Sequence, residues 1–87
     1  MDRTAWQNLF KKRFVLDPVD ERSRPGESTY SHGDKQITVI IKAATPSGAL
    51  RAESLTDTEE CLVLNRGQGR YSYVDWNMIE AIITVDN

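Results

Sequence analysis

Hydrophobic residues near the start of the chain recur with the period of an amphipathic helix. Within residues 5–14 the apolar positions share one face at the helical spacing, and they are Ala5, Trp6, Leu9, Phe10 and Phe14. Thr4 stands just before them and carries a hydroxyl of the kind that caps helices. We therefore expect a helix over residues 4–14 including its cap, with an apolar face that must pack on the rest of the protein.

From Gln36 onward the period changes from that of a helix to that of a strand. Ile37, Val39 and Ile41 alternate with their neighbours, and four further apolar runs follow between turn residues. We expect five antiparallel strands within residues 36–86, at about 36–43, 50–55, 61–65, 71–76 and 79–85. The first two strands should form a hairpin.

The five expected strands are too short to bury enough surface as a flat sheet. A strongly bent antiparallel barrel, with bends at Gly48 and at the corner of residues 75–78, is the economical solution. Its last two strands, 71–76 and 79–85, would leave apolar edges. Such edges favour pairing with a second copy of the chain.

Residues 17–35 lie between the expected helix and the expected strands and have no hydrophobic period. Prolines, glycines and charged residues punctuate this segment, which predicts a loop with a short extended piece near residues 28–30. Most ordered connections are shorter, so we expect this linker to be mobile or functional. Helix, linker and strands together make a single domain over residues 1–87.

The composition is that of a globular protein and argues against several classes of function. Apolar residues make up 39% and charged residues 28% of the chain. No apolar run approaches the roughly 18 residues of a membrane span. The start of the chain lacks the apolar segment and cleavage site of a secretory signal, so we expect a cytoplasmic protein without membrane contact.

The residue types that carry most enzyme and metal chemistry are scarce. One cysteine, Cys61, and one histidine, His32, are too few for a disulfide or a zinc site. Cys61 opens an apolar run, which favours a small buried side chain over the alternative of a reactive thiol. A catalytic triad would have to use His32 in a loop, and no glycine loop leads into a helix. We expect no cofactor and no enzymatic activity.

The charge is divided unevenly along the chain. The net charge is −2; residues 1–36 carry seven basic against six acidic residues, and residues 37–87 carry four against seven. The strand-rich part is therefore acidic. A polyanion could bind only through local basic features against this mean field.

The order of the expected elements resembles the Sm/LSm fold, an SH3-like barrel family that includes the bacterial Hfq type. In residues 57–64, DTEECLVL, Asp57 matches the Asp of the first family motif and Cys61 stands in place of its Asn. In residues 74–82, VDWNMIEAI, Asp75 and Trp76 stand in place of the Arg-Gly pair of the second motif. The resemblance covers about residues 4–14 and 36–86 and fits a divergent member, of phage or environmental origin.

The resemblance implies a ring of identical subunits that binds single-stranded RNA. Residues 71–76 of one subunit would pair with residues 79–85 of the next, and such heterologous contacts would close at about five to seven copies. The positions carried over from the pore of family members are Asp57, Cys61, Asp75, Trp76 and Asn77. Trp76 would stack on a base and Asn77 would read a base edge. The alternative for Trp76 is packing in the core or at the subunit interface.

Arginines outside the expected pore are further candidates for RNA contact. Arg66 and Arg70 flank Gly67-Gln68-Gly69 in an expected hairpin loop, and the planar guanidinium suits phosphate and bases. The alternative is a solvated hairpin tip. The basic run of residues 11–13 is either a phosphate site or a solvated end that the helix dipole favours.

Acidic residues of the turn before the third strand point away from RNA. Asp57, Glu59 and Glu60 would repel phosphate if they repeated around a ring. They make either a solvated turn or a site for divalent cations or a basic protein tail.

These patterns leave open what the protein does. The first hypothesis is a non-catalytic Sm-like ring that binds single-stranded RNA. The second is an oligomeric structural or protein-interaction module of the same fold that has lost RNA binding, and a third is a monomeric SH3-like adaptor.

Overall fold

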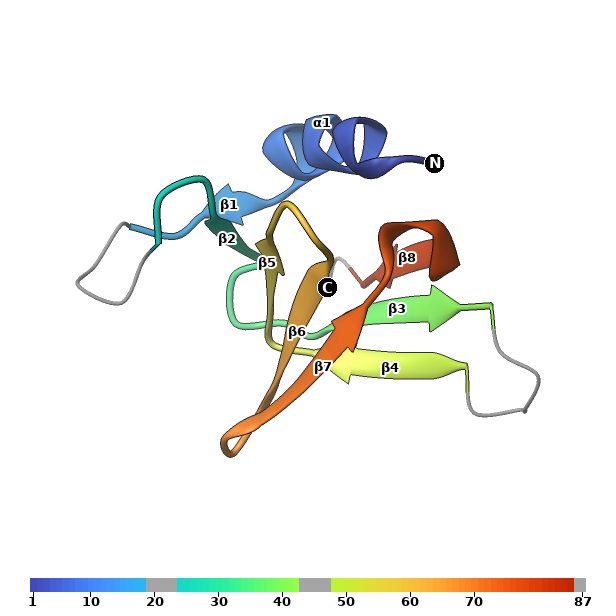
Figure 1. Cartoon of the computed structure of the whole chain (residues 1–87). Helices are drawn as coiled ribbons and strands as arrows, with labels where there is room; N and C mark the ends of the chain where they lie inside the picture. The colour runs from blue at the N-terminus through green and yellow to red at the C-terminus, as the bar shows by residue number, and fades with distance from the viewer. Residues whose placement is uncertain (19–23, 43–47, 86–87) are drawn as a thin grey trace.

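A computed structural model describes residues 1–18, 24–42 and 48–85 of the chain. One helix, α1, lies above two antiparallel sheets (Figure 1). The described part of the protein is therefore mainly β, with the helix at the N-terminus, as the sequence predicted.

Helix α1 spans Arg3–Arg13 and begins two residues earlier than its expected apolar face. Asp2, not Thr4, is the N-cap, and its carboxylate accepts a hydrogen bond from the backbone N–H of Ala5 at 3.0 Å. A carboxylate at this position also interacts favourably with the helix dipole, so the expected cap at Thr4 is wrong.

Within the described residues, no helix has both the length and the apolar character needed to cross a membrane.

The larger sheet has five strands in the order β1-β2-β5-β6-β7. Its strands are β1 (Val15–Leu16), β2 (Ser28–Ser31), β5 (Ser54–Asp57), β6 (Leu62–Gly67) and β7 (Arg70–Val74). The short extended piece predicted near residues 28–30 of the loop is confirmed as β2, which pairs with β5. Residues 19–23 of that loop lie outside the described part of the chain.

The smaller sheet has three strands in the order β4-β3-β8. Its strands are β3 (Ile37–Ile41), β4 (Ala49–Ala52) and β8 (Ile79–Thr84). The predicted hairpin of the first two strands is confirmed, with Val39 opposite Leu50. Ile37 and Val39 point into the core, as their alternation predicted.

The expected second strand, residues 50–55, is divided between the two sheets. Glu53 separates β4 from β5, and its backbone N–H donates to the carbonyl of Asn65 at 2.7 Å. The predicted five-stranded barrel is therefore corrected to two sheets, and the described strands do not close on themselves. A strand that bends from one sheet into another allows the two sheets to share one core.

The hairpin between β6 and β7 has a tighter turn than the predicted loop of residues 66–70. Gln68 and Gly69 are the two turn residues, with φ of 56° and 76°. Two successive residues with positive φ match the right-handed twist of the flanking strands. The strands therefore extend to Gly67 and from Arg70, and the turn points away from α1 (Figure 1).

The predicted corner between the last two strands is present as a short 3₁₀ helix, η1 (Trp76–Met78). The carboxylate of Asp75 accepts a hydrogen bond from the backbone N–H of Asn77 at 2.9 Å and so caps this turn. Trp76 belongs to η1, whereas the sequence placed it at the end of the fourth strand. The corner joins the outer strand of the larger sheet, β7, to an outer strand of the smaller sheet, β8.

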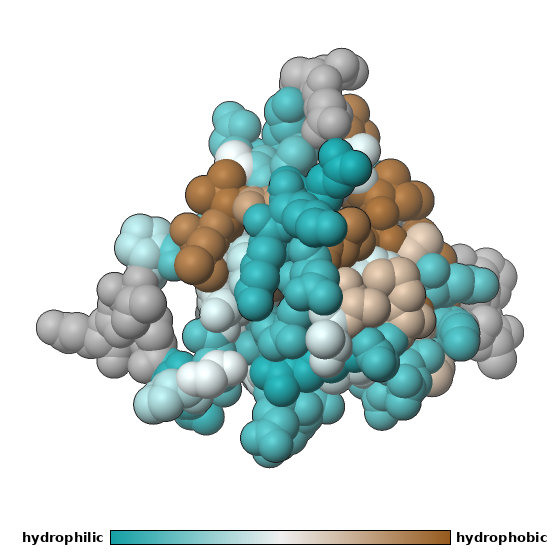
Figure 2. Space-filling model, turned by 90° about the horizontal axis from the view of Figure 1, so that it is seen from above, coloured by the Kyte–Doolittle hydropathy of each residue, from teal (hydrophilic) through white to brown (hydrophobic). Residues whose placement is uncertain are grey.

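The core lies between α1 and the two sheets and is centred on Phe10, which is fully buried. The Phe10 ring packs against four aromatic rings, with centroids 5.7–6.3 Å away, and they belong to Trp6, Phe14, Tyr30 and Trp76. Seen from the helix side, a hydrophilic band crosses the molecule with hydrophobic residues on both sides of it (Figure 2). The apolar face of the helix thus packs inward, as its period predicted.

Substitution of Phe10 tests the importance of this packing. We expect Phe10→Ala to lower the free energy of unfolding by about 3–5 kcal/mol, because the change removes a buried ring and leaves a cavity. Urea denaturation followed by circular dichroism measures the loss. Tyr73→Ala, at an exposed position, should change stability by less than about 0.5 kcal/mol. Equal effects of the two changes would contradict this account of the core.

Candidate functional site

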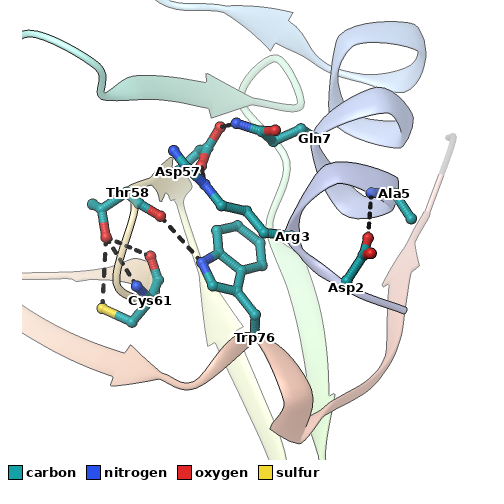
Figure 3. A network of polar contacts seen from close by, with 8 residues as sticks. All are labelled: Asp2, Arg3, Ala5, Gln7, Asp57, Thr58, Cys61 and Trp76. Carbon is teal, nitrogen blue, oxygen red and sulfur yellow. Dashed lines mark hydrogen bonds and ion pairs between the residues drawn. The ribbon is translucent and has the colours of Figure 1, made fainter.

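The expected site begins at Asp57, the last residue of β5, whose carboxylate faces α1. The residue is only 3% exposed. Its Oδ1 accepts from Arg3 Nε at 2.9 Å and its Oδ2 accepts from Gln7 Nε2 at 2.6 Å (Figure 3). Arg3 and Gln7 are four residues apart and so lie on the same face of the helix. Asp57 therefore fastens α1 to the larger sheet.

Both carboxylate oxygens of Asp57 are thus occupied by contacts within the chain. A buried carboxylate is retained only where donors compensate its lost hydration, and here the helix supplies them. The sequence placed Asp57 in an exposed acidic turn with Glu59 and Glu60. In the structure Asp57 is buried, whereas Glu59 and Glu60 are exposed.

The turn after Asp57 is closed by its own polar groups. The Thr58 hydroxyl donates to the Cys61 carbonyl at 2.7 Å, and the Cys61 N–H lies 3.1 Å from the same hydroxyl. Cys61 carries a free thiol, is partly exposed and lies just before β6. The cysteine that the sequence predicted to be buried is only partly buried, because this turn places Cys61 at the boundary between core and surface.

Trp76 lies in the core at 6% exposure. Its indole N–H donates to the Thr58 carbonyl at 3.1 Å (Figure 3), and its ring packs on Phe10. Of the two alternatives left by the sequence, core packing is the one that the structure has. The expected stacking on a base requires an exposed face of the indole, which Trp76 does not offer in this conformation.

The neighbours of Trp76 remain at the surface. Asp75 and Asn77 are exposed, and the Asp75 carboxylate is held at the start of η1 by the N–H of Asn77. Because Trp76 binds the carbonyl of Thr58, the corner of residues 75–77 lies beside the turn of residues 58–61. The structure therefore does bring together the two segments that the resemblance places at one site.

Arg66 and Arg70 lie apart from that site. In the β6–β7 ladder Leu62 is opposite Val74, and Gly67 is opposite Arg70 at the other end. Arg70 is exposed, and its guanidinium approaches the carbonyls of Arg66 and Gly67 at 3.4 Å. Arg66 is partly buried, and its Nε is buried without a hydrogen-bond partner among the described residues. The two arginines are therefore a separate feature of the hairpin turn.

A surface that the sequence did not single out lies on the outer side of the larger sheet. Tyr71 and Tyr73 on β7 are 55% and 71% exposed. They border an open groove of about 620 Å³, whose lining also includes Val63, Cys61 and the exposed Glu59 and Glu60. The alternation of Tyr71-Ser72-Tyr73 with the buried Val74 was the available signal, since it places both tyrosines on the face opposite the core.

The search for a metal site in the described part of the chain found none. Among residues 1–18, 24–42 and 48–85, no group of three or more histidine, cysteine or acidic residues could hold a metal ion.

Comparison with protein-family models, with curated proteins and with solved structures gave no match for this chain. The Sm-like resemblance therefore remains a hypothesis based on pattern.

Removal of the Asp57 carboxylate tests its structural role. We expect Asp57→Ala to lower the free energy of unfolding by about 1–3 kcal/mol, because Arg3 and Gln7 lose their acceptor while Arg3 can still turn to water. Urea denaturation gives the value. Asp34→Ala removes an exposed carboxylate and is the matched control. A loss at Asp57 no larger than at Asp34 would show that the contact contributes nothing to stability.

Proposed function

We propose that this protein is a non-catalytic, homo-oligomeric interaction module with an Sm-like fold, whose copies join through β7 and β8. The observation that carries the proposal is the position of these two strands. Each is an outer strand of its sheet. An outer strand has one row of backbone N–H and C=O groups that only another chain or water can satisfy.

The side chains at these two edges support association over exposure to water. Ile83 on β8 is 49% exposed and Val85 follows it in the chain, also exposed. On the other edge, β7 has a free row of backbone N–H and C=O groups, and its exposed Tyr71 and Tyr73 extend from the face of the sheet. Neither edge carries the lysines or prolines that monomeric proteins use to prevent pairing. An edge with exposed apolar residues, as at β8, is typical of strands that pair between subunits.

The two edges differ, so the contact that they favour is heterologous. β7 of one copy would meet β8 of the next, and an open assembly would keep one free β7 edge and one free β8 edge until the ring closes. We propose a closed ring of about five to seven subunits, in line with the Sm-like arrangement of a helix, bent strands and a corner before the last strand. A chain of only 87 residues also gains from burial between subunits.

The chemistry of the corner favours the interaction module over an RNA-binding ring. The indole of Trp76 is in the core, and the carboxylate of Asp57 is bound to α1. The residues left exposed between the two segments include Asp75, Glu59 and Glu60, which repel phosphate. Recognition of RNA by the expected pore residues therefore has little support beyond Asn77.

RNA binding elsewhere on the ring is a second candidate, supported by the β6–β7 turn. Arg70 is exposed there, next to Arg66, on a hairpin that points away from α1 (Figure 1). Repeated around a ring, these arginines would form a basic circle at some distance from the acidic turn. Arginine at such a place suits phosphate and stacked bases.

Substitution at the β8 edge tests the proposed assembly. We expect Ile83→Lys to convert the oligomer to a folded monomer, because an edge lysine would be buried without a partner in the contact. Light scattering coupled to size-exclusion chromatography gives the mass, and circular dichroism reports folding. Val15→Lys makes the same change at an exposed residue of β1, outside the proposed contact, and should leave the oligomer intact. A wild-type protein that is monomeric would refute the ring.

The RNA hypothesis has its own measurement. Binding of a fluorescent oligouridylate at about 50 mM salt should be salt-dependent and should weaken about tenfold in the double variant Arg66→Ala/Arg70→Ala. Trp76→Phe should leave the affinity unchanged, since the indole is in the core. Lys42→Ala/Arg51→Ala removes the same charge at other exposed positions and serves as control. Absence of binding at this salt concentration would leave the interaction module as the one remaining proposal.

A further inference from the structure

The groove beside β7 lies on a sheet face that the rest of the described chain leaves uncovered. Thr56, Val63 and Tyr73 are cross-strand neighbours on β5, β6 and β7. Their sequence neighbours Leu55, Leu62, Leu64 and Val74 are buried in the core. Because side chains alternate along a strand, the row from Thr56 to Tyr73 faces outward. It forms the floor of the groove.

Aromatic and acidic side chains border this floor, and we call the whole the Tyr–Glu groove. Tyr71 and Tyr73 lie along β7, and Glu59 and Glu60 extend from the turn before β6. The opposite border carries Glu27 next to Arg24. Exposed phenol rings and carboxylates thus share one open concavity on the protein surface.

The net charge of the groove is negative once the contacts within the chain are considered. Two arginines line it, Arg3 and Arg24. The guanidinium of Arg3 is already paired with the buried carboxylate of Asp57. Among the described residues that line the groove, Arg24 is then the one cation against Glu27, Glu59 and Glu60. A phosphate backbone would be repelled here, whereas a cation would be attracted.

We propose that the Tyr–Glu groove binds an extended, arginine- or lysine-rich segment of another protein. A guanidinium or ammonium group would lie over the face of Tyr73 or Tyr71, where the ring attracts cations. Neighbouring cationic side chains would pair with Glu59 and Glu60, and arginine could do so through two parallel hydrogen bonds. The stems of these side chains would cover Val63 and the floor of the groove.

The location of the groove makes this binding independent of the proposed assembly. The tyrosine side chains extend from the face of β7, whereas pairing with β8 of another copy would use the backbone along its edge. A ring would repeat the groove in every subunit and would bind a multivalent basic tail more tightly than a monomer does. The groove is nevertheless complete within one chain.

The first experiment measures binding of a defined peptide to the full chain. A fluorescein-labelled peptide of five Arg-Gly repeats is titrated with the protein, and fluorescence anisotropy is recorded at about 50 and 200 mM salt. We expect saturable binding that weakens at the higher salt. The same peptide with citrulline in place of arginine keeps size and shape without charge and should not bind. Equal binding of the citrulline peptide, or no binding of the arginine peptide, would overturn the proposal.

Two pairs of variants locate the site. Glu59→Gln/Glu60→Gln should weaken binding about tenfold, whereas Asp34→Asn/Glu53→Gln, with the same change in net charge outside the groove, should weaken it less than about threefold. Tyr73→Leu should weaken binding about threefold, and Tyr73→Phe, which retains the aromatic face, should not. Equal losses in the two charge variants would mean that the peptide responds only to overall charge, and equal losses in Tyr73→Leu and Tyr73→Phe would mean that the aromatic face does not hold the peptide; either result would refute the groove.

Competing occupants have distinct outcomes. If Tyr73→Leu dissociates the oligomer, a second copy occupies the groove and the proposal fails. If oligouridylate binds and loses affinity in Tyr73→Leu but gains it in Glu59→Gln/Glu60→Gln, the groove is an RNA site and the proposal also fails. Peptide binding that persists in the Ile83→Lys monomer supports the groove even where the ring itself is refuted.

Discussion

The packing of Phe10 against aromatic residues from two distant parts of the chain is the constraint on which the rest of the structure depends. Its ring contacts Tyr30 of β2 and Trp76 of the corner, and Trp6 and Phe14 complete the cluster within and just after α1. Burial of this ring fixes the helix over the core and draws the corner beneath it. Trp76 then reaches the Thr58 carbonyl, so the helix, the turn before β6 and the corner before β8 are held as one unit.

The burial of these residues determines which side chains remain available to bind a partner. Asp57 and Trp76, the most distinctive residues at the expected site, make their hydrogen bonds inside the protein and leave little for a ligand. Exposed side chains that could bind a partner lie instead on the edges of the two sheets and on the outer face of β5, β6 and β7. A small domain with exposed aromatic and aliphatic side chains on its sheet edges and sheet faces is suited to contacts with other chains. Such contacts bury apolar surface that the core of the domain is too small to bury.

The parts of the fold that the sequence predicted are those with a clear hydrophobic period. The helix has its apolar residues at helical spacing, and Ile37, Val39 and Ile41 show the alternation of β3. Strand β2 was only hinted at, because hydroxyl residues surround Tyr30 and hide its alternation, although Tyr30 is buried opposite Leu55. The break at Glu53 had no signal in the sequence, since either a straight or a bent strand fits the same letters. Its cause is the closing of two sheets around one core.

By itself, the sequence determined where a helix, the main strands, the β6–β7 hairpin and the corner occur, because hydrophobic period and turn chemistry are local properties of the chain. It also determined that Asp57, Trp76 and the neighbouring turn residues come at the junctions of these elements. Only the tertiary structure decided which of them are exposed. Asp57 is buried because Arg3, 54 residues away in the chain, arrives on the helix to pair with it, and no local pattern encodes that meeting. The same folding leaves Tyr71 and Tyr73 uncovered, because nothing in the described chain packs on the outer face of β7.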